Sequence, residues 1–94
     1  MSGTRSTAAR NEHPILMYST PWCGDCWRAK RLFTEHGVAY TEIDIERDPA
    51  AAERVARING GMQSVPTILF PDGSILVEPT NAQLREKLSA LTPR

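Results

Sequence analysis

Residues 15–33 read ILMYSTPWCGDCWRAKRLF, and this stretch contains both cysteines of the chain. The apolar run from Ile15 to Tyr18 is typical of a buried strand, and the Ser-Thr-Pro sequence after it indicates a loop. From Cys23 to His36, apolar residues recur at the three- and four-residue spacing of one helix face, and Gly37 suits a C-terminal cap. The stretch therefore predicts a strand, a loop and a helix that opens with the cysteine pair.

A second strand and a second helix are expected next. Residues 39–45 alternate in polarity, which predicts a strand with unequal faces. Asp48 is a good N-cap and Pro49 suits the first helical position, so a helix should run to residue 59. Its apolar face is expected to carry Ala52, Val55 and Ala56.

The remaining segment predicts a hairpin followed by a last helix. Residues 67–70 and 74–77 flank Pro71-Asp72-Gly73, a turn sequence. Thr80 and Gln83 have the spacing of a capping box, and leucines follow at helical spacing. The order βαβαββα predicts an α/β fold with a mixed sheet and helices on its faces.

Composition limits the function. The chain has 94 residues, of which 40% are hydrophobic and 23% charged, as expected for one globular domain. Eleven basic and eleven acidic residues give no net charge, which argues against nucleic acid as a partner. Apolar runs fall far short of the ~20 residues that a membrane helix needs, and residues 1–13 lack the apolar core of a secretory signal. We expect a flexible tail over residues 1–13, a domain over residues 14–94, and a monomer in the cytoplasm.

The cysteine pair is the candidate reactive centre. Cys23 would meet unpaired backbone N–H groups and the positive end of the helix dipole, both of which stabilise a thiolate. Cys26, one turn later on the core face, would resolve a mixed disulfide formed at Cys23. Asp25 should partly oppose the activation of Cys23 because a carboxylate repels a thiolate. Trp22, just before the pair, and Asp25, between the two cysteines, are candidates for contact with substrate.

A metal site is the competing interpretation of the pair. Zinc needs four ligands, and the only histidines are His13 and His36. His36 lies ten residues after Cys26, about 15 Å along a helix, so it cannot close a site with the pair. A metal or an iron–sulfur cluster shared between two chains stays open. Within one chain we expect neither a metal nor an organic cofactor.

Pro66 precedes the third strand at a position where a proline either starts the strand or sits in a special turn. The bond between Val65 and Pro66 can be cis or trans, and the local sequence does not decide between them.

Three segments together resemble the glutaredoxins of the thioredoxin-fold superfamily: Trp22-Cys23-Gly24-Asp25-Cys26, Ser64-Val65-Pro66 and Pro71-Asp72-Gly73. Within that family the chain is similar to the mycoredoxins, which work with mycothiol. The segments that carry this second similarity are Ile43-Asp44-Ile45-Glu46, Asp48-Pro49-Ala50-Ala51-Ala52-Glu53, Asn59-Gly60-Gly61 and Val65-Pro66-Thr67.

The resemblance implies a four-stranded sheet in the order 2-1-3-4, with the third strand antiparallel to the first. It also implies a cis Pro66 that faces Cys23, and a backbone edge at Val65 that pairs with the bound thiol or peptide. Thr80 and Asn81 align with the place where glutaredoxins hold a carboxylate of glutathione.

These features predict a thiol-disulfide oxidoreductase that reduces mixed disulfides between proteins and a small thiol, with mycothiol as the first candidate. One alternative is a thioredoxin-like electron donor to ribonucleotide reductase or a peroxidase, recharged by a flavoprotein disulfide reductase. Another is a binding module for a metal or an iron–sulfur cluster.

Overall fold

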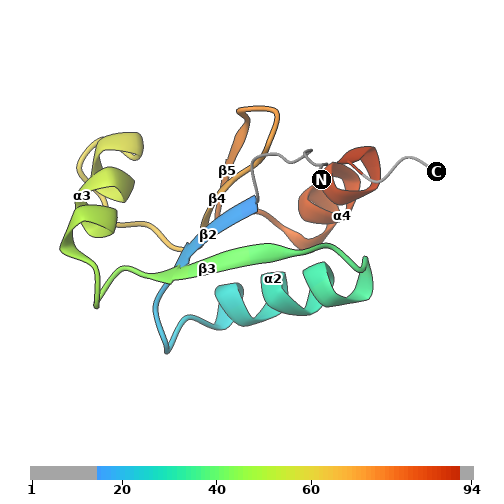
Figure 1. The fold of residues 1–94 in the computed structure, drawn as a ribbon, viewed down its shortest axis with the longest axis horizontal. Coiled ribbons are helices and arrows are strands. Elements are labelled where there is room, and N and C mark those ends of the chain that lie inside the picture. Colours follow the sequence, from blue (N-terminus) through green and yellow to red (C-terminus); the bar gives the residue numbers. More distant parts are fainter. Residues whose placement is uncertain (1–14, 92–94) are drawn as a thin grey trace, which may run out of the picture.

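A computed structural model describes residues 15–91 of the chain (Figure 1). Its elements in chain order are β2 (Ile15–Ser19), α2 (Gly24–Glu35), β3 (Tyr40–Asp44), α3 (Pro49–Ile58), β4 (Thr67–Leu69), β5 (Ile75–Val77) and α4 (Asn81–Leu91). This order confirms the predicted βαβαββα arrangement. The expected tail over residues 1–13 lies outside the described residues.

The four strands form one mixed sheet in the order β3-β2-β4-β5. β2 runs parallel to β3, with Ile15 opposite Tyr40, and antiparallel to β4, with Met17 opposite Ile68. β4 and β5 form the predicted antiparallel hairpin. The sheet order and the antiparallel third strand are therefore those that the resemblance implied.

Helices cover both faces of the sheet (Figure 1). The larger apolar cluster joins α2 and α4 to one face of β2 and β4; it includes Met17, Phe33, Ile68, Leu84 and Leu88. The smaller cluster joins α3 to the opposite face and contains Tyr18, Ile45, Ala51 and Val55. Alternate residues of β2 thus enter different clusters, as the twofold period of a strand requires.

The buried face of α3 differs from the predicted one. Asp48 caps this helix as expected, since its side chain accepts a hydrogen bond of 3.1 Å from the backbone N–H of Ala51. The buried residues are Ala51 and Val55, which lie one turn apart, whereas Ala52 and Ala56 are only half-buried on the flank. Successive residues of a helix are rotated by about 100° around its axis, so neighbouring residues face different directions. The prediction put Ala52 on the buried face, whereas the residue buried there is the preceding one, Ala51.

The alternation expected along residues 39–45 is also only partly present. β3 is an edge strand, and both Thr41 and Glu42 are exposed although they point to opposite faces. At a sheet edge, other elements cover neither face of the strand fully, so residues that alternate in polarity do not alternate in burial. Ile45, just after the strand, is buried.

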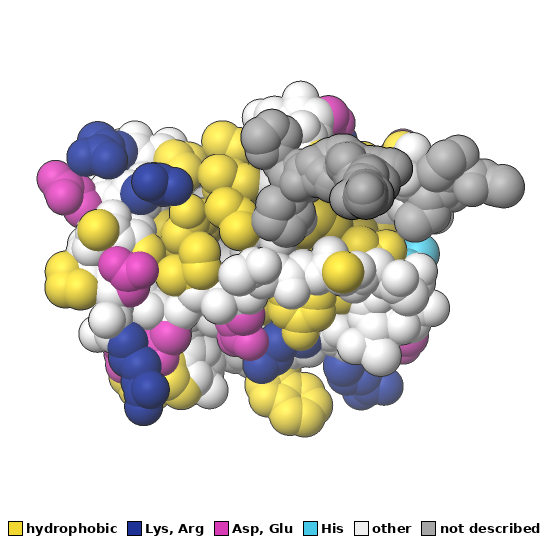
Figure 2. All heavy atoms as spheres, viewed as in Figure 1, with side chains coloured by type: hydrophobic (Ala, Val, Ile, Leu, Met, Phe, Trp, Pro, Cys, Tyr) yellow, Lys and Arg dark blue, Asp and Glu magenta, His cyan; other side chains and the backbone are white. Residues whose placement is uncertain are grey.

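On the face drawn in Figure 2, acidic and basic side chains are interspersed, and apolar side chains gather between α3 and the β4–β5 hairpin. No helix within residues 15–91 is long and apolar enough to cross a membrane.

Candidate active site

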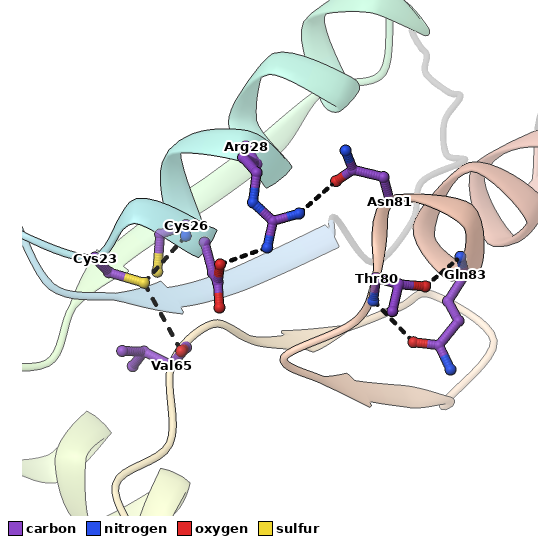
Figure 3. Close-up of polar contacts among 8 residues, drawn as sticks. Cys23, Cys26, Arg28, Val65, Thr80, Asn81 and Gln83 are labelled. Atoms are coloured by element: carbon purple, nitrogen blue, oxygen red, sulfur yellow. Dashed lines mark hydrogen bonds and ion pairs between the residues drawn. The ribbon is translucent and has the colours of Figure 1, made fainter.

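Cys23 is the N-cap of α2, with an extended backbone at φ −84° and ψ 109°. Its Sγ accepts a hydrogen bond of 3.0 Å from the backbone N–H of Cys26 (Figure 3). The residue is only half-buried. A thiolate here would be stabilised by the N–H group and the helix dipole while remaining accessible to a disulfide in solution.

The loop before β4 faces this sulfur. The Val65-Pro66 peptide bond is cis, as the resemblance implied. Cys23 Sγ donates to the carbonyl oxygen of Val65 at 3.7 Å, across 42 residues of sequence (Figure 3). The backbone edge at Val65, which the resemblance implies as the place where substrate pairs, therefore lies beside Cys23.

Cys26 lies on the core side of α2 and is buried, with 2% of its surface exposed. Burial, together with the hydrogen bond and the charge of the neighbouring Cys23, raises the pKa of its thiol to about 12. Both cysteines are free thiols. The two sulfurs therefore occupy different environments, one accessible at the helix end and one enclosed in the core.

Arg28 connects Asp25 and Asn81, two of the residues expected to contact substrate. Its Nη2 forms an ion pair with Oδ1 of Asp25, and its Nη1 donates a hydrogen bond of 2.7 Å to Oδ1 of Asn81 (Figure 3). The negative charge of Asp25 is therefore compensated, and the side-chain oxygen of Asn81 already accepts a hydrogen bond from Arg28. The three-residue spacing of Asp25 and Arg28 allows the ion pair to be predicted, but the contact with Asn81 depends on the tertiary fold.

Comparison with known proteins places the chain in a family. The family model for glutaredoxin matches residues 15–75. The chain belongs to the glutaredoxin family. Members of this family are thiol-disulfide oxidoreductases.

Individual relatives agree with this assignment. A protein of Mycobacterium tuberculosis named as a glutaredoxin is 46% identical over 74 residues, which cover 79% of this chain and 88% of the relative. Mycoredoxin 1 of Corynebacterium glutamicum is 34% identical over 77 residues, covering 82% of this chain and 95% of the relative. The crystal structure of a glutaredoxin from Archaeoglobus fulgidus superposes with a TM-score of 0.64 at 28% identity, covering 83% of this chain and 84% of that one.

The other residues proposed for the site are placed as follows. Trp22 is 73% exposed next to Cys23. Thr80 accepts the backbone N–H of Gln83 at 3.1 Å, and its own backbone N–H donates to the Gln83 side chain at 2.8 Å. The predicted capping box is therefore formed, and both of these Thr80 groups serve the start of α4.

The described residues offer little to a metal ion. Within residues 15–91, no three side chains of the His, Cys, Asp and Glu types gather closely enough to hold one. Nδ1 of His36 lies 3.0 Å from the carbonyl oxygen of Leu32, at the far end of α2 from the cysteines. His13 lies outside the described residues.

Proposed function

We propose that this family member reduces mixed disulfides between proteins and a small thiol, with Cys23 as the nucleophile and mycothiol as the first candidate thiol. The observation that carries the proposal is the position of Cys23 Sγ, which accepts the Cys26 N–H at 3.0 Å on a half-buried helix end. An accessible thiolate held in this way is suited to attack a disulfide.

In the first step, the Cys23 thiolate attacks the small-thiol sulfur of the mixed disulfide. A new sulfur–sulfur bond forms between Cys23 and the small thiol while the old bond breaks. The electron pair leaves with the protein sulfur, which departs as a thiolate and takes a proton from water. The protein is reduced, and Cys23 carries the small thiol.

In the second step, either Cys26 or a second small thiol attacks the adduct on Cys23. Attack by Cys26 gives an internal disulfide and releases the small thiol, whereas attack by a small thiol gives its symmetrical disulfide and restores Cys23. Burial is the main cause of the raised pKa of Cys26, so its reactive thiolate form is scarcer than that of an exposed thiol. We therefore expect the external small thiol to carry most of the flux on small substrates.

The choice of mycothiol is supported by two observations. One relative bears the name mycoredoxin 1. In addition, the Asn81 side-chain carbonyl accepts a hydrogen bond from Arg28, and Arg28 is already paired with Asp25, so this cation is not free to bind a substrate carboxylate. In this proposal the reaction takes place in the cytoplasm without a metal or organic cofactor, and a flavoprotein disulfide reductase recycles the oxidised small thiol.

The proposal is tested with one model protein that carries glutathione, mycothiol or bacillithiol on a single cysteine. The reduced chain is mixed with each form, and transfer of the small thiol to Cys23 is followed by intact mass. We expect the mycothiol form to react fastest. Faster transfer of glutathione or bacillithiol would overturn the choice of thiol, and transfer of none would overturn the function.

A further inference from the structure

We propose that a groove between α2 and β3, next to Trp27, binds the protein half of the mixed disulfide. This inference rests on the proposed function and adds a docking surface to it. The partner it fits is a protein surface that presents an apolar side chain to Trp27 and a carboxylate to Arg31.

The groove has a volume of about 480 Å³, and its lining residues are Trp27, Lys30, Arg31, Thr34, Glu35 and Tyr40. Trp27 is 62% exposed at one wall. Tyr40, on β3, is half-buried because its ring packs against Phe33 at a centroid distance of 4.6 Å. The groove therefore pairs one fixed aromatic ring with one that is largely open to solvent.

The groove begins close to the reactive sulfur. Trp27 follows Cys23 by four residues, and its backbone N–H donates to the Cys23 carbonyl at 3.2 Å. Arg31 follows by four more, so all three residues lie along one side of α2. At 1.5 Å per residue, Trp27 and Arg31 lie about 6 Å and 12 Å along the helix from Cys23. A protein whose mixed disulfide is attacked by Cys23 would extend over this surface.

The two flanks of α2 differ in what they offer. Arg28 and Asp25 lie on the flank facing α4, where Arg28 reaches Asn81. Trp27 and Lys30 lie on the opposite flank, beside Tyr40. The flank near α4 contains Asn81, at the place where the family resemblance puts the small thiol, which leaves the groove for the protein half of the substrate.

The charged side chains of the groove differ in whether they have a partner and in how far they lie from Cys23. Lys30 lies 3.3 Å from a carboxylate oxygen of Glu42, so its charge is compensated. Arg31 has no ion pair or side-chain hydrogen bond within residues 15–91, and neither does Glu35, which lies one turn farther from Cys23. The uncompensated charge nearer the reactive sulfur is therefore positive, which favours an acidic group on the partner.

The fold itself does not need Trp27. The core face of α2 is made by Cys26, Ala29, Leu32 and Phe33, all of them buried. Trp, Tyr and Arg are the residue types that most often dominate binding energy at protein interfaces. An exposed tryptophan in a groove with a tyrosine and an unpaired arginine is therefore better explained by binding than by packing.

The test compares two substrates that carry the same small thiol. The first is serum albumin, an acidic protein, with mycothiol on its single free cysteine. The second is the mixed disulfide of mycothiol and 2-mercaptoethanol. We expect Trp27→Ala to lower kcat/KM about tenfold for the protein substrate and to leave the small substrate unchanged. Arg31→Glu should act in the same direction, with an effect that weakens as salt is raised.

Met62→Ala is the matched control because Met62 is an apolar side chain, 65% exposed, that does not line the groove. It should change neither rate. Equal losses on both substrates for Trp27→Ala, or no loss on either, would overturn the docking surface. So would a dimer that Trp27→Ala converts to a monomer in sedimentation, since the groove would then bind a second copy. A wild-type chain inactive on both substrates would instead overturn the proposed function.

Discussion

Arg28 donates a hydrogen bond of 2.7 Å from Nη1 to Oδ1 of Asn81, although 53 residues separate them in the sequence. The same guanidinium pairs with Asp25, two residues after the reactive Cys23. The Asp25 carboxylate, which by itself would disfavour a thiolate at Cys23, is thus paired with the Arg28 guanidinium. Asn81 on α4 holds that guanidinium in place. The environment of Cys23 therefore depends on α4 as well as on α2.

Arg28→Ala should slow alkylation of Cys23 by iodoacetamide at neutral pH, because it leaves the Asp25 charge uncompensated. Both side chains are about half exposed, so we expect a modest two- to fivefold effect, consistent with ~0.2–1 kcal/mol for surface pairs. Asp25→Asn added to Arg28→Ala should restore the rate. Arg31→Ala, on the same helix but without a carboxylate contact, is the control. An Arg28→Ala rate equal to that of the wild type would show that Arg28 does not influence Cys23.

Cys26 should make the reduced protein less stable at alkaline pH. Its thiol has a pKa of about 12 when folded, whereas a free thiol titrates near 8.5. The unfolded chain therefore loses this proton first as pH rises, and stability falls from about pH 8.5 upward. Denaturant unfolding of the wild type and Cys26→Ala, both fully reduced, measures the difference. The wild type should lose stability more steeply between pH 8 and 10; parallel curves would contradict the raised pKa.

Thr80 should contribute to stability through the capping box. Thr80→Ala removes the acceptor for the Gln83 N–H, and loss of such a cap costs about 1 kcal/mol. Thr80→Ser keeps the hydroxyl and should restore most of the stability measured by denaturant unfolding. If Thr80→Ala is as stable as the wild type but binds mycothiol disulfide more weakly, Thr80 acts on substrate rather than as a cap.

Local signals in the sequence predicted most of the fold. The cysteine helix, the hairpin around Pro71-Asp72-Gly73 and the Thr80 capping box each depend on residues a few positions apart. The face of α3 was misplaced because Ala51, Ala52 and Ala56 are chemically identical, so composition does not show which of them meets the sheet.

The contacts of the site were harder to predict from residues that are close together in the sequence. The approach of Val65 to Cys23 was implied by family resemblance, since 42 residues separate them. The contact between Arg28 and Asn81 was not predicted at all. The residues around Asn81 in the sequence do not indicate that it contacts Arg28. Only the packing of α4 against α2 brings these two side chains together.

The central claim is that Cys23 alone takes up the small thiol and that Cys26 is dispensable for this step. It is tested most directly by intact mass of Cys26→Ser after mixing with a mycothiol mixed disulfide, with Cys23→Ser as the control. We predict that Cys26→Ser gains the mass of one mycothiol on Cys23 and keeps a large part of its turnover on small substrates, while Cys23→Ser gains nothing. Loss of both the adduct and the turnover in Cys26→Ser would contradict the account.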